Sequence, residues 1–233
     1  MKGNSMKKAF ICTAFILAAA VYSFGAQARN IELVDVPTAN SMLKAELRYD
    51  VKFYSGGGVL NRVYVGIFDR LMIGAALNVT NLVGTGQIQV ILPPKLLGKF
   101  RITDDDGAVP AIAIGYEGES YFDMVARGVF LSVTKEVMLG SAFIQLTGTV
   151  YSNQFSEILN NIDMGAGIAF AITPDLALSA EADSFLLDNS LNINGGISYR
   201  FEPITLEVIL KYGLGENDIR HSRVLRLTYI SYF

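Results

Sequence analysis

The sequence predicts an all-β protein, folded as a transmembrane antiparallel up-and-down β-barrel of about twelve strands. Apolar and polar residues alternate with period two in one segment after another, a pattern typical of strands and not of helices. Most of these segments have the roughly nine to eleven residues that a tilted strand needs to cross a hydrocarbon core. The connections tend to alternate between tight turns and longer loops, as in a barrel with periplasmic turns and external loops.

Residues 1–28 are predicted to be a secretory signal peptide, which lies outside the fold. Lysines precede an almost wholly apolar run over residues 9–22, and Ala26 and Ala28 form a small-x-small cleavage site. An uncleaved membrane anchor is the alternative, but the run is shorter than the roughly 20 residues of a spanning helix. Cys12, the one cysteine of the chain, lies inside this peptide. The exported chain is therefore expected to contain no cysteine.

The barrel is predicted to occupy residues 41–233, and its first strand shows the alternation most clearly. From Leu43 to Phe53 every second residue is apolar, while the residues between them carry charges of alternating sign. Alternation of the same kind recurs over 191–201 and 204–212. The expected strands, in order, are 41–54, 59–68, 71–80, 95–104, 108–117, 125–134, 137–151, 162–172, 176–185, 190–201, 204–213 and 222–233.

The connections between these strands support the barrel. Tight turns follow the even-numbered strands, at 69–70, 105–107, 135–136, 173–175 and 202–203. Longer loops follow most odd-numbered strands, at 81–94, 118–124, 152–161 and 214–221, with short connections at 55–58 and 186–189. A soluble antiparallel sandwich or lipocalin-like barrel is the competing architecture. The sign alternation of the first strand suits a lumen instead, and aromatic residues near strand ends suit the girdles of a membrane barrel.

The last segment resembles the C-terminal assembly signal of bacterial outer-membrane proteins. Leu225, Leu227, Tyr229 and the terminal Phe233 lie on one face of an alternating strand. Ser231 departs from the pattern, which prefers an apolar or aromatic residue there. The resemblance implies that the barrel assembly machinery is a partner during biogenesis.

A second resemblance rests on short strings between Val36 and Tyr116. They are Val36 to Ala39, Gly56 to Val59, Val65 to Gly74, Lys99 to Arg101 and Val109 to Tyr116. Together they resemble a group of small uncharacterised bacterial outer-membrane barrels, and in part the YjbH-type barrel linked to exopolysaccharide export. The strings are mainly strands and turns, so they support the architecture and carry over no functional residue.

Assignment of faces by alternation predicts a polar lumen. The candidate lumen-lining residues are Lys44, Glu46, Arg48, Asp50, Lys52, Arg62, Lys99, Arg101, Glu181, Asp183, Arg200, Glu207, Lys211 and Arg226. Such a set forms either a narrow polar pore or a salt-bridged network that fills the barrel. Side chains just fill a barrel of about eight strands, whereas about sixteen strands leave a clear channel, so twelve lies between the two.

The sequence predicts no catalytic residue, no metal site and no cofactor. An outer-membrane lipid hydrolase would need a serine and a histidine on one lipid-facing surface. The single histidine, His221, adjoins Ser222, and neighbours on a strand point to opposite faces. One histidine and no exported cysteine disfavour a zinc site. Glu181 and Asp183 share a face and could bind a cation or act as an acid/base pair, but neutralisation by lumen arginine or lysine is favoured.

Two segments are left open. Residues 29–40 are predicted to be an N-terminal periplasmic segment, with insertion into the lumen as the alternative. Residues 81–94 are too apolar for a freely solvated loop. Three placements of this segment are open: it folds into the barrel mouth, it rests on the lipid interface, or it pairs with a neighbouring strand.

The net charge of -3 removes the basic surface that a nucleic-acid binder needs. The sequence thus predicts a non-enzymatic barrel of the outer membrane, exported by its signal peptide and surrounded by outer-membrane lipid. It is either a structural barrel or a narrow polar pore for small solutes. The alternatives are an outer-membrane lipid hydrolase and a soluble periplasmic β-barrel binding module.

Overall fold

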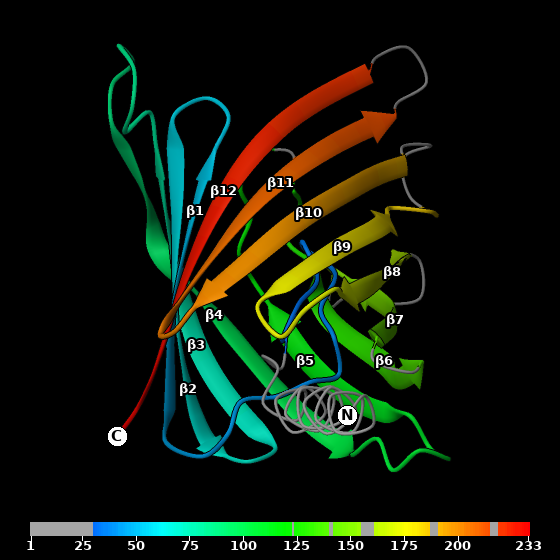
Figure 1. The fold of residues 1–233 in the computed structure, drawn as a ribbon. Helices are drawn as coiled ribbons and strands as arrows, with labels where there is room; N and C mark the ends of the chain where they lie inside the picture. The colour runs from blue at the N-terminus through cyan, green and yellow to red at the C-terminus, as the bar shows by residue number, and fades with distance from the viewer. Residues whose placement is uncertain (1–29, 123, 140–141, 155–160, 187–190, 215–218) are drawn as a thin grey trace, which may run out of the picture.

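The computed structural model describes residues 30–122, 124–139, 142–154, 161–186, 191–214 and 219–233. It is a closed barrel of twelve antiparallel strands, in which each strand pairs with its sequence neighbours and β1 pairs with β12 (Figure 1). The predicted architecture and strand number are confirmed. In the part of the chain that the structure describes, no helix is long and apolar enough to span a membrane.

The strand bounds follow the predicted segments closely. They are β1 (Glu46–Tyr54), β2 (Gly58–Phe68), β3 (Leu71–Thr80), β4 (Gln89–Thr103), β5 (Ala111–Glu117), β6 (Gly128–Leu139), β7 (Ala142–Ser152), β8 (Ile162–Ala171), β9 (Leu176–Asp183), β10 (Leu191–Phe201), β11 (Ile204–Leu214) and β12 (Ile219–Tyr232).

Two predicted connections are wrong. The expected turn at 135–136 lies inside β6, where Lys135 pairs with Leu146 of β7. The second part of the expected loop at 81–94 belongs to β4, which begins at Gln89 and pairs with the end of β3, so strand pairing is the placement that the structure shows for 89–94. The register of the β3–β4 pair shifts between Ala76 and Asn78, opposite the stretch of β4 that contains Pro93 and Pro94. Because proline has no N–H to donate to a ladder, an irregularity of the pairing at this position is expected.

The two ends of the barrel differ as the sequence predicts. Short connections join β2 to β3, β8 to β9 and β10 to β11, and this end is called the turn end here. Longer connections join β3 to β4 and β5 to β6 at the opposite end, the loop end. β1 starts and β12 finishes at the turn end, and the pairing of these two strands along the whole of β1 closes the barrel (Figure 1).

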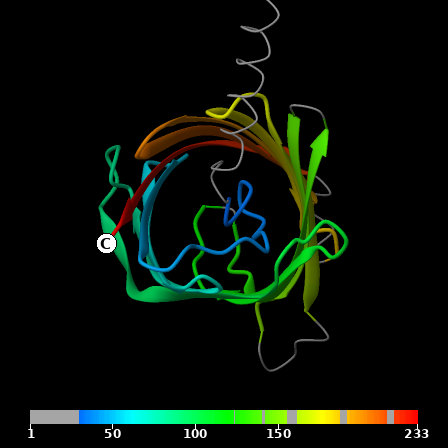
Figure 2. The same ribbon diagram turned by 60° about the horizontal axis from the view of Figure 1, so that its bottom comes forward.

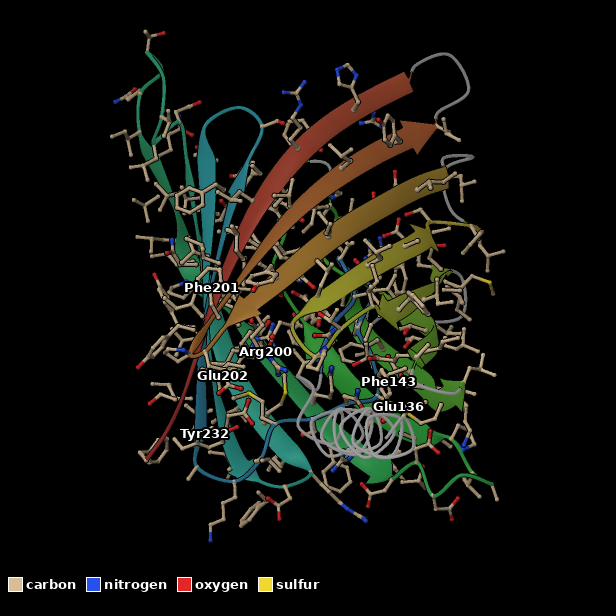
Figure 3. All side chains as sticks on the ribbon, viewed as in Figure 1. Glu136, Phe143, Arg200, Phe201, Glu202 and Tyr232 are labelled. Atoms are coloured by element: carbon tan, nitrogen blue, oxygen red, sulfur yellow. The ribbon has the colours of Figure 1, made fainter. Side chains whose placement is uncertain are left out.

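The two faces of the wall also divide as predicted. On β1, Arg48, Asp50 and Lys52 are buried, whereas Tyr49 and Phe53 between and beyond them are exposed. The neighbours Arg200 and Phe201 of β10, labelled in Figure 3, face opposite sides: Arg200 lines the interior cavity and Phe201 is exposed. Exposed apolar side chains occur on strands around the barrel, among them Val63, Ile73, Ile114, Leu131, Leu146, Ile168, Leu178, Ile197, Val208 and Leu225.

Residues 30–42, called the plug here, lie inside the barrel, where Figure 2 shows them crossing the ring of strands. They form a small hairpin: Leu33 N donates to Val36 O, Thr38 N donates to Ile31 O, and Glu32 bridges Pro37. Of the two placements considered for residues 29–40, the structure shows insertion into the lumen for the residues it describes. Sequence alternation cannot reveal this, because the plug pairs with no strand of the wall.

Candidate functional site: a plugged polar lumen

Glu32 of the plug lies against cations from three strands. Its carboxylate forms ion pairs with Arg62 of β2 and Arg226 of β12, and it lies 3.3 Å from the Nζ atom of Lys52 of β1. All of these side chains are almost completely buried. Guanidinium groups bind carboxylates with two parallel donors, so this contact fixes orientation as well as charge.

Asp35 of the plug binds to the same side of the lumen. Lys52 Nζ lies 2.8 Å from Asp35 Oδ1, and Lys211 Nζ of β11 lies 2.9 Å from Asp35 Oδ2. The hydroxyl of Tyr121 donates to Asp35 Oδ1 at 2.7 Å. The inward side chains of β11, β12, β1 and β2 thus form a basic wall that binds both carboxylates of the plug.

The plug carboxylates stay ionised because of this wall. Burial raises the pKa of Glu32, but attraction to Arg62 and Lys52 more than compensates, and the pKa lies well below its ordinary value. Burial raises the pKa of Asp35 too, and attraction to Lys211 and Lys52 brings it well below the ordinary range. Both groups therefore bind the wall as anions.

The basic wall carries carboxylates of its own, but too few to neutralise it. Asp50 accepts from Arg48 at 3.0 Å and from Arg62 at 3.2 Å. Glu207 pairs with Arg226. Glu46 of β1 is buried as well. With Lys52 and Lys211 included, five cations face three carboxylates on these four strands, and the plug supplies two more negative charges.

The opposite wall, formed by β8 and β9, binds the plug in another way. Glu181 accepts hydrogen bonds from three successive backbone N–H groups at the hairpin tip, those of Val34, Asp35 and Val36, at 2.9–3.0 Å. The Nδ2 group of Asn194 also donates to Glu181, at 2.8 Å. This carboxylate, which we call the amide-binding group, recognises backbone and not side-chain charge.

Two glycines make room for the hairpin on this wall. A Cβ atom at Gly165 would lie 2.8 Å from Cγ2 of Val36, and one at Gly167 would lie 2.5 Å from Cδ1 of Leu33. Both distances are shorter than real contacts. Gly165 and Gly167 therefore leave the space that the hairpin occupies, besides the curvature that glycine permits in a barrel strand.

The rest of the plug binds mainly to β4, β6 and β7. The carbonyl oxygen of Pro37 accepts from Ser132 Oγ at 2.8 Å and from Thr149 Oγ1 at 2.7 Å. Ala39 N donates to Thr134 Oγ1 at 2.8 Å, and Lys99 Nζ donates to the Asn40 carbonyl at 3.2 Å. Polar groups of the wall thus satisfy backbone groups of the plug that would otherwise be buried without partners.

The loop between β5 and β6 covers the plug from the loop end. Tyr121 and Arg127 of this loop are buried, as is Glu119, which pairs with Arg62 at 3.4 Å. Arg127 Nε donates to the Asp35 carbonyl at 3.0 Å. Tyr121 also joins an apolar cluster with plug residues Ile31, Val34 and Met42 and with wall residues Leu60, Tyr64, Ile209 and Val224. Side chains of this loop therefore pack on the plug from the loop end.

The turn end retains a cavity below the plug. It encloses about 810 Å³, part of it open solvent. Asn30 and Leu33 of the plug form one side of it. Its polar lining includes Arg48, Gln145, Ser179, Ser198, Arg200, Thr205, Glu207, Arg226 and Thr228. A solute entering from this end would meet arginine side chains before it reached the plug.

The structure brings most candidate lumen residues inside the barrel, with one correction. Lys44 lies before β1 and is exposed, since the chain turns from the plug into the wall there, and its N–H donates to Asp69. Glu46, Arg101 and Arg200 lie inward at the turn end, where Arg101 pairs with Asp104 and Arg200 donates to the Pro174 carbonyl. The other candidates lie deeper: Arg48, Asp50, Lys52, Arg62, Lys99, Glu181, Asp183, Glu207, Lys211 and Arg226.

Sequence reasoning missed several residues of this site. Glu32 and Asp35 lie outside the strands, and Glu119, Tyr121 and Arg127 lie on a connection. The alternation of apolar and polar residues assigns a face only to residues of strands, so it cannot place these residues in the lumen. The one available signal was the apolar character of the segments that carry them, which is unusual for solvated tails and loops.

The carboxylate pair Glu181 and Asp183 is not free to bind a cation. Arg127 pairs with Asp183 at 2.9 Å, as the favoured prediction of neutralisation by arginine or lysine expects, while Glu181 is bound by amides instead. Among the residues that the structure describes, no group of three or more histidine, cysteine, aspartate or glutamate side chains could hold a metal ion.

The geometry at His221 matches the expectation for neighbours on a strand. His221 is exposed on the outer face of β12, whereas Ser222 is buried on the inner face. They form no catalytic pair. The cleavage residues Ala26 and Ala28 lie outside the described residues.

The residues of the expected assembly signal lie on the outer face of β12. Leu225 and Tyr229 are exposed, and Phe233, directly after the strand, donates its N–H to the Ala45 carbonyl at 3.1 Å. Their role in assembly stays a prediction.

Comparisons with known proteins add distant similarities. No family model and no curated sequence matches the chain. It is similar to an outer membrane channel from Pseudomonas putida F1, with 13% identity, a TM-score of 0.49, and coverage of 85% of this chain and 100% of that one. The NanC porin follows with 11% identity, a TM-score of 0.41, and coverage of 80% and 99%. Wzi, a carbohydrate binding outer membrane β-barrel from Escherichia coli, has 9% identity, a TM-score of 0.36, and coverage of 76% and 52%.

These similarities are too distant to carry an argument about activity. The resemblance to YjbH-type barrels likewise stays a prediction.

Proposed function

We propose that the protein is a non-enzymatic barrel of the bacterial outer membrane, whose lumen is a narrow polar pore closed by the plug. The observation that carries the proposal is the inverted distribution of side chains, with apolar residues outside and ionised residues inside. A soluble barrel would expose its charged face to water and bury the apolar one.

The outer surface supports insertion into lipid. Exposed apolar side chains surround the barrel, and aromatic residues lie near both of its ends: Tyr49, Phe100, Tyr199, Phe201 and Tyr229 toward the turn end, and Phe53 and Tyr212 toward the loop end. A closed barrel leaves no unpaired strand edge, which is a requirement of spanning structures in hydrocarbon. The signal peptide and the C-terminal pattern agree with export to the outer membrane and with handling by the barrel assembly machinery.

The lumen supports a pore that opens when the plug leaves. The charged groups that bind Glu32 and Asp35 would be hydrated in a water-filled lumen, so release exchanges ion pairs for water contacts. Cleavage after Ala28, as the sequence predicts, would leave β1 as the only covalent link between the plug and the wall. A permanent structural network is the competing hypothesis, because the same ion pairs also stiffen the barrel.

Planar-bilayer conductance of the refolded exported chain separates these hypotheses. The intact protein should conduct rarely, and deletion of residues 30–42 should give frequent discrete openings. Cysteines at Ala39 and Thr134, whose backbone N and Oγ1 atoms lie 2.8 Å apart, offer a second variant in the otherwise cysteine-free exported chain. Their disulfide should suppress openings, and reduction should restore them. A folded deletion variant without conductance would leave only the structural barrel.

A further inference from the structure

We infer that the basic wall is a binding site for small dicarboxylate solutes, which the carboxylates of Glu32 and Asp35 occupy in this structure. The inference rests on the proposed pore and adds the class of solute to it. Four cationic side chains carry it: Lys52, Arg62, Lys211 and Arg226.

The cations form a built site and not a solvated patch. Each of their side chains is at most 7% exposed, and each contacts a carboxylate of the plug. Burial of an unpaired cation costs free energy of folding, so the plug carboxylates supply the partners that the cations of the wall need. Loss of the plug leaves five cations, with Arg48 included, against the three carboxylates Glu46, Asp50 and Glu207 on these strands. The open wall is therefore positively charged.

The arrangement selects for two carboxylates. Guanidinium groups of Arg62 and Arg226 flank the first, and the second is bound by the ammonium groups of Lys52 and Lys211 and the hydroxyl of Tyr121. Lys52 contacts both, at 3.3 Å from Glu32 and 2.8 Å from Asp35, so the two contacted oxygens lie no more than about 6 Å apart. A short dicarboxylate can span this separation, whereas a monocarboxylate fills only one half of the site.

The path to the site starts in the cavity at the turn end. Arg48 and Arg226 line this cavity, and Arg226 also contacts Glu32. The carboxylates Asp175 and Glu207 line it as well, so its charge is mixed. The opposite wall offers no cation of its own strands to an anion: Glu181 is a carboxylate, and the charge of Asp183 is balanced by Arg127.

Succinate is the probe, with butyrate as the monocarboxylate control. Titration calorimetry on the detergent-solubilised deletion variant should show succinate binding at least tenfold tighter than butyrate. Lys211→Gln in the same background should weaken succinate binding about tenfold. Lys135→Gln, on the outside near the turn end, should leave it unchanged. The intact chain should bind no succinate, because the plug occupies the site.

A variant that keeps the plug provides the second test. In the full exported chain, Glu32→Gln with Asp35→Asn should gain succinate binding that the unmodified chain lacks. Equal binding of succinate and butyrate, or no effect of Lys211→Gln, would overturn the inference even if the deletion variant conducts. Succinate binding without conductance would instead retain the site and reject the pore, so the two failures are distinguishable.

Discussion

The two walls of the lumen bind the same hairpin by different means. The basic wall pairs side-chain cations with Glu32 and Asp35, whereas the opposite wall offers one carboxylate, Glu181, to three backbone amides and leaves space at Gly165 and Gly167. The basic wall recognises the charged side chains of the plug, and the opposite wall recognises the conformation of its backbone. The charge of the plug and its conformation are therefore recognised by separate groups, and substitutions on each wall distinguish the two contributions.

The largest effect is expected from Glu32→Gln. This change leaves three buried cations without one of their shared partners, and breaking a buried ion pair costs about 3–5 kcal/mol. The plug should leave the lumen far more often. Maleimide labelling of a cysteine placed at the buried Val34 should speed up by at least a hundredfold, since about 1.4 kcal/mol corresponds to a factor of ten. Glu202→Gln, at an exposed turn, is the control, and equal labelling of both would contradict the role of the basic wall.

A smaller effect is expected from Glu181→Gln on the opposite wall. The amide oxygen can still accept, but the charge that strengthens three N–H contacts is lost, at about 2 kcal/mol. Labelling of the Val34→Cys reporter should rise roughly thirtyfold. Asp163→Asn on β8 is the matched control, because Asp163 is a lumen carboxylate whose observed contacts are to Met164 and Leu186. A larger effect from the control than from Glu181→Gln would refute the amide-binding role.

Gly165→Ala tests the shape of the opposite wall without a change of charge. The added methyl group meets Val36 at 2.8 Å, and overpacking of this kind costs about 1–2 kcal/mol. Openings in bilayers should become about tenfold more frequent, while the barrel itself resists denaturation as before. Gly148→Ala, where the new methyl group meets no atom within 4 Å, should change neither quantity. Unfolding of the Gly165→Ala barrel would point to curvature as the sole role of this glycine.

Tyr121→Phe should have the smallest effect. It removes one hydrogen bond to Asp35, at about 1 kcal/mol, but keeps the ring that packs near Lys52 and Lys211. The Val34→Cys reporter should label about fivefold faster. An effect as large as that of Glu32→Gln would mean that the loop between β5 and β6, and not the basic wall, contributes most to holding the plug in the lumen.

Alternation along the chain was enough to predict twelve strands and the face of most charged residues. Asp50, Lys52 and Arg62 follow from a period of two, because neighbours on a strand must point to opposite sides. The prediction of faces and strand bounds was wrong where the chain departs from a regular strand. Lys44 continues the alternation of β1 in sequence but lies on the turn that leads out of the lumen. Pro93 and Pro94 end the loop predicted at 81–94, yet β4 contains both of them at an irregularity of its pairing with β3.

The barrel, its inverted faces and the polar lumen follow from periodicity along the chain, because periodicity is a local property. What fills the lumen depends on contacts between distant segments. Arg226 and Glu32 are 194 positions apart, and their contact depends on closure of the barrel by β1 and β12 around the plug. No local pattern encodes that contact, since it arises from ionised groups of distant strands that need partners once water is excluded.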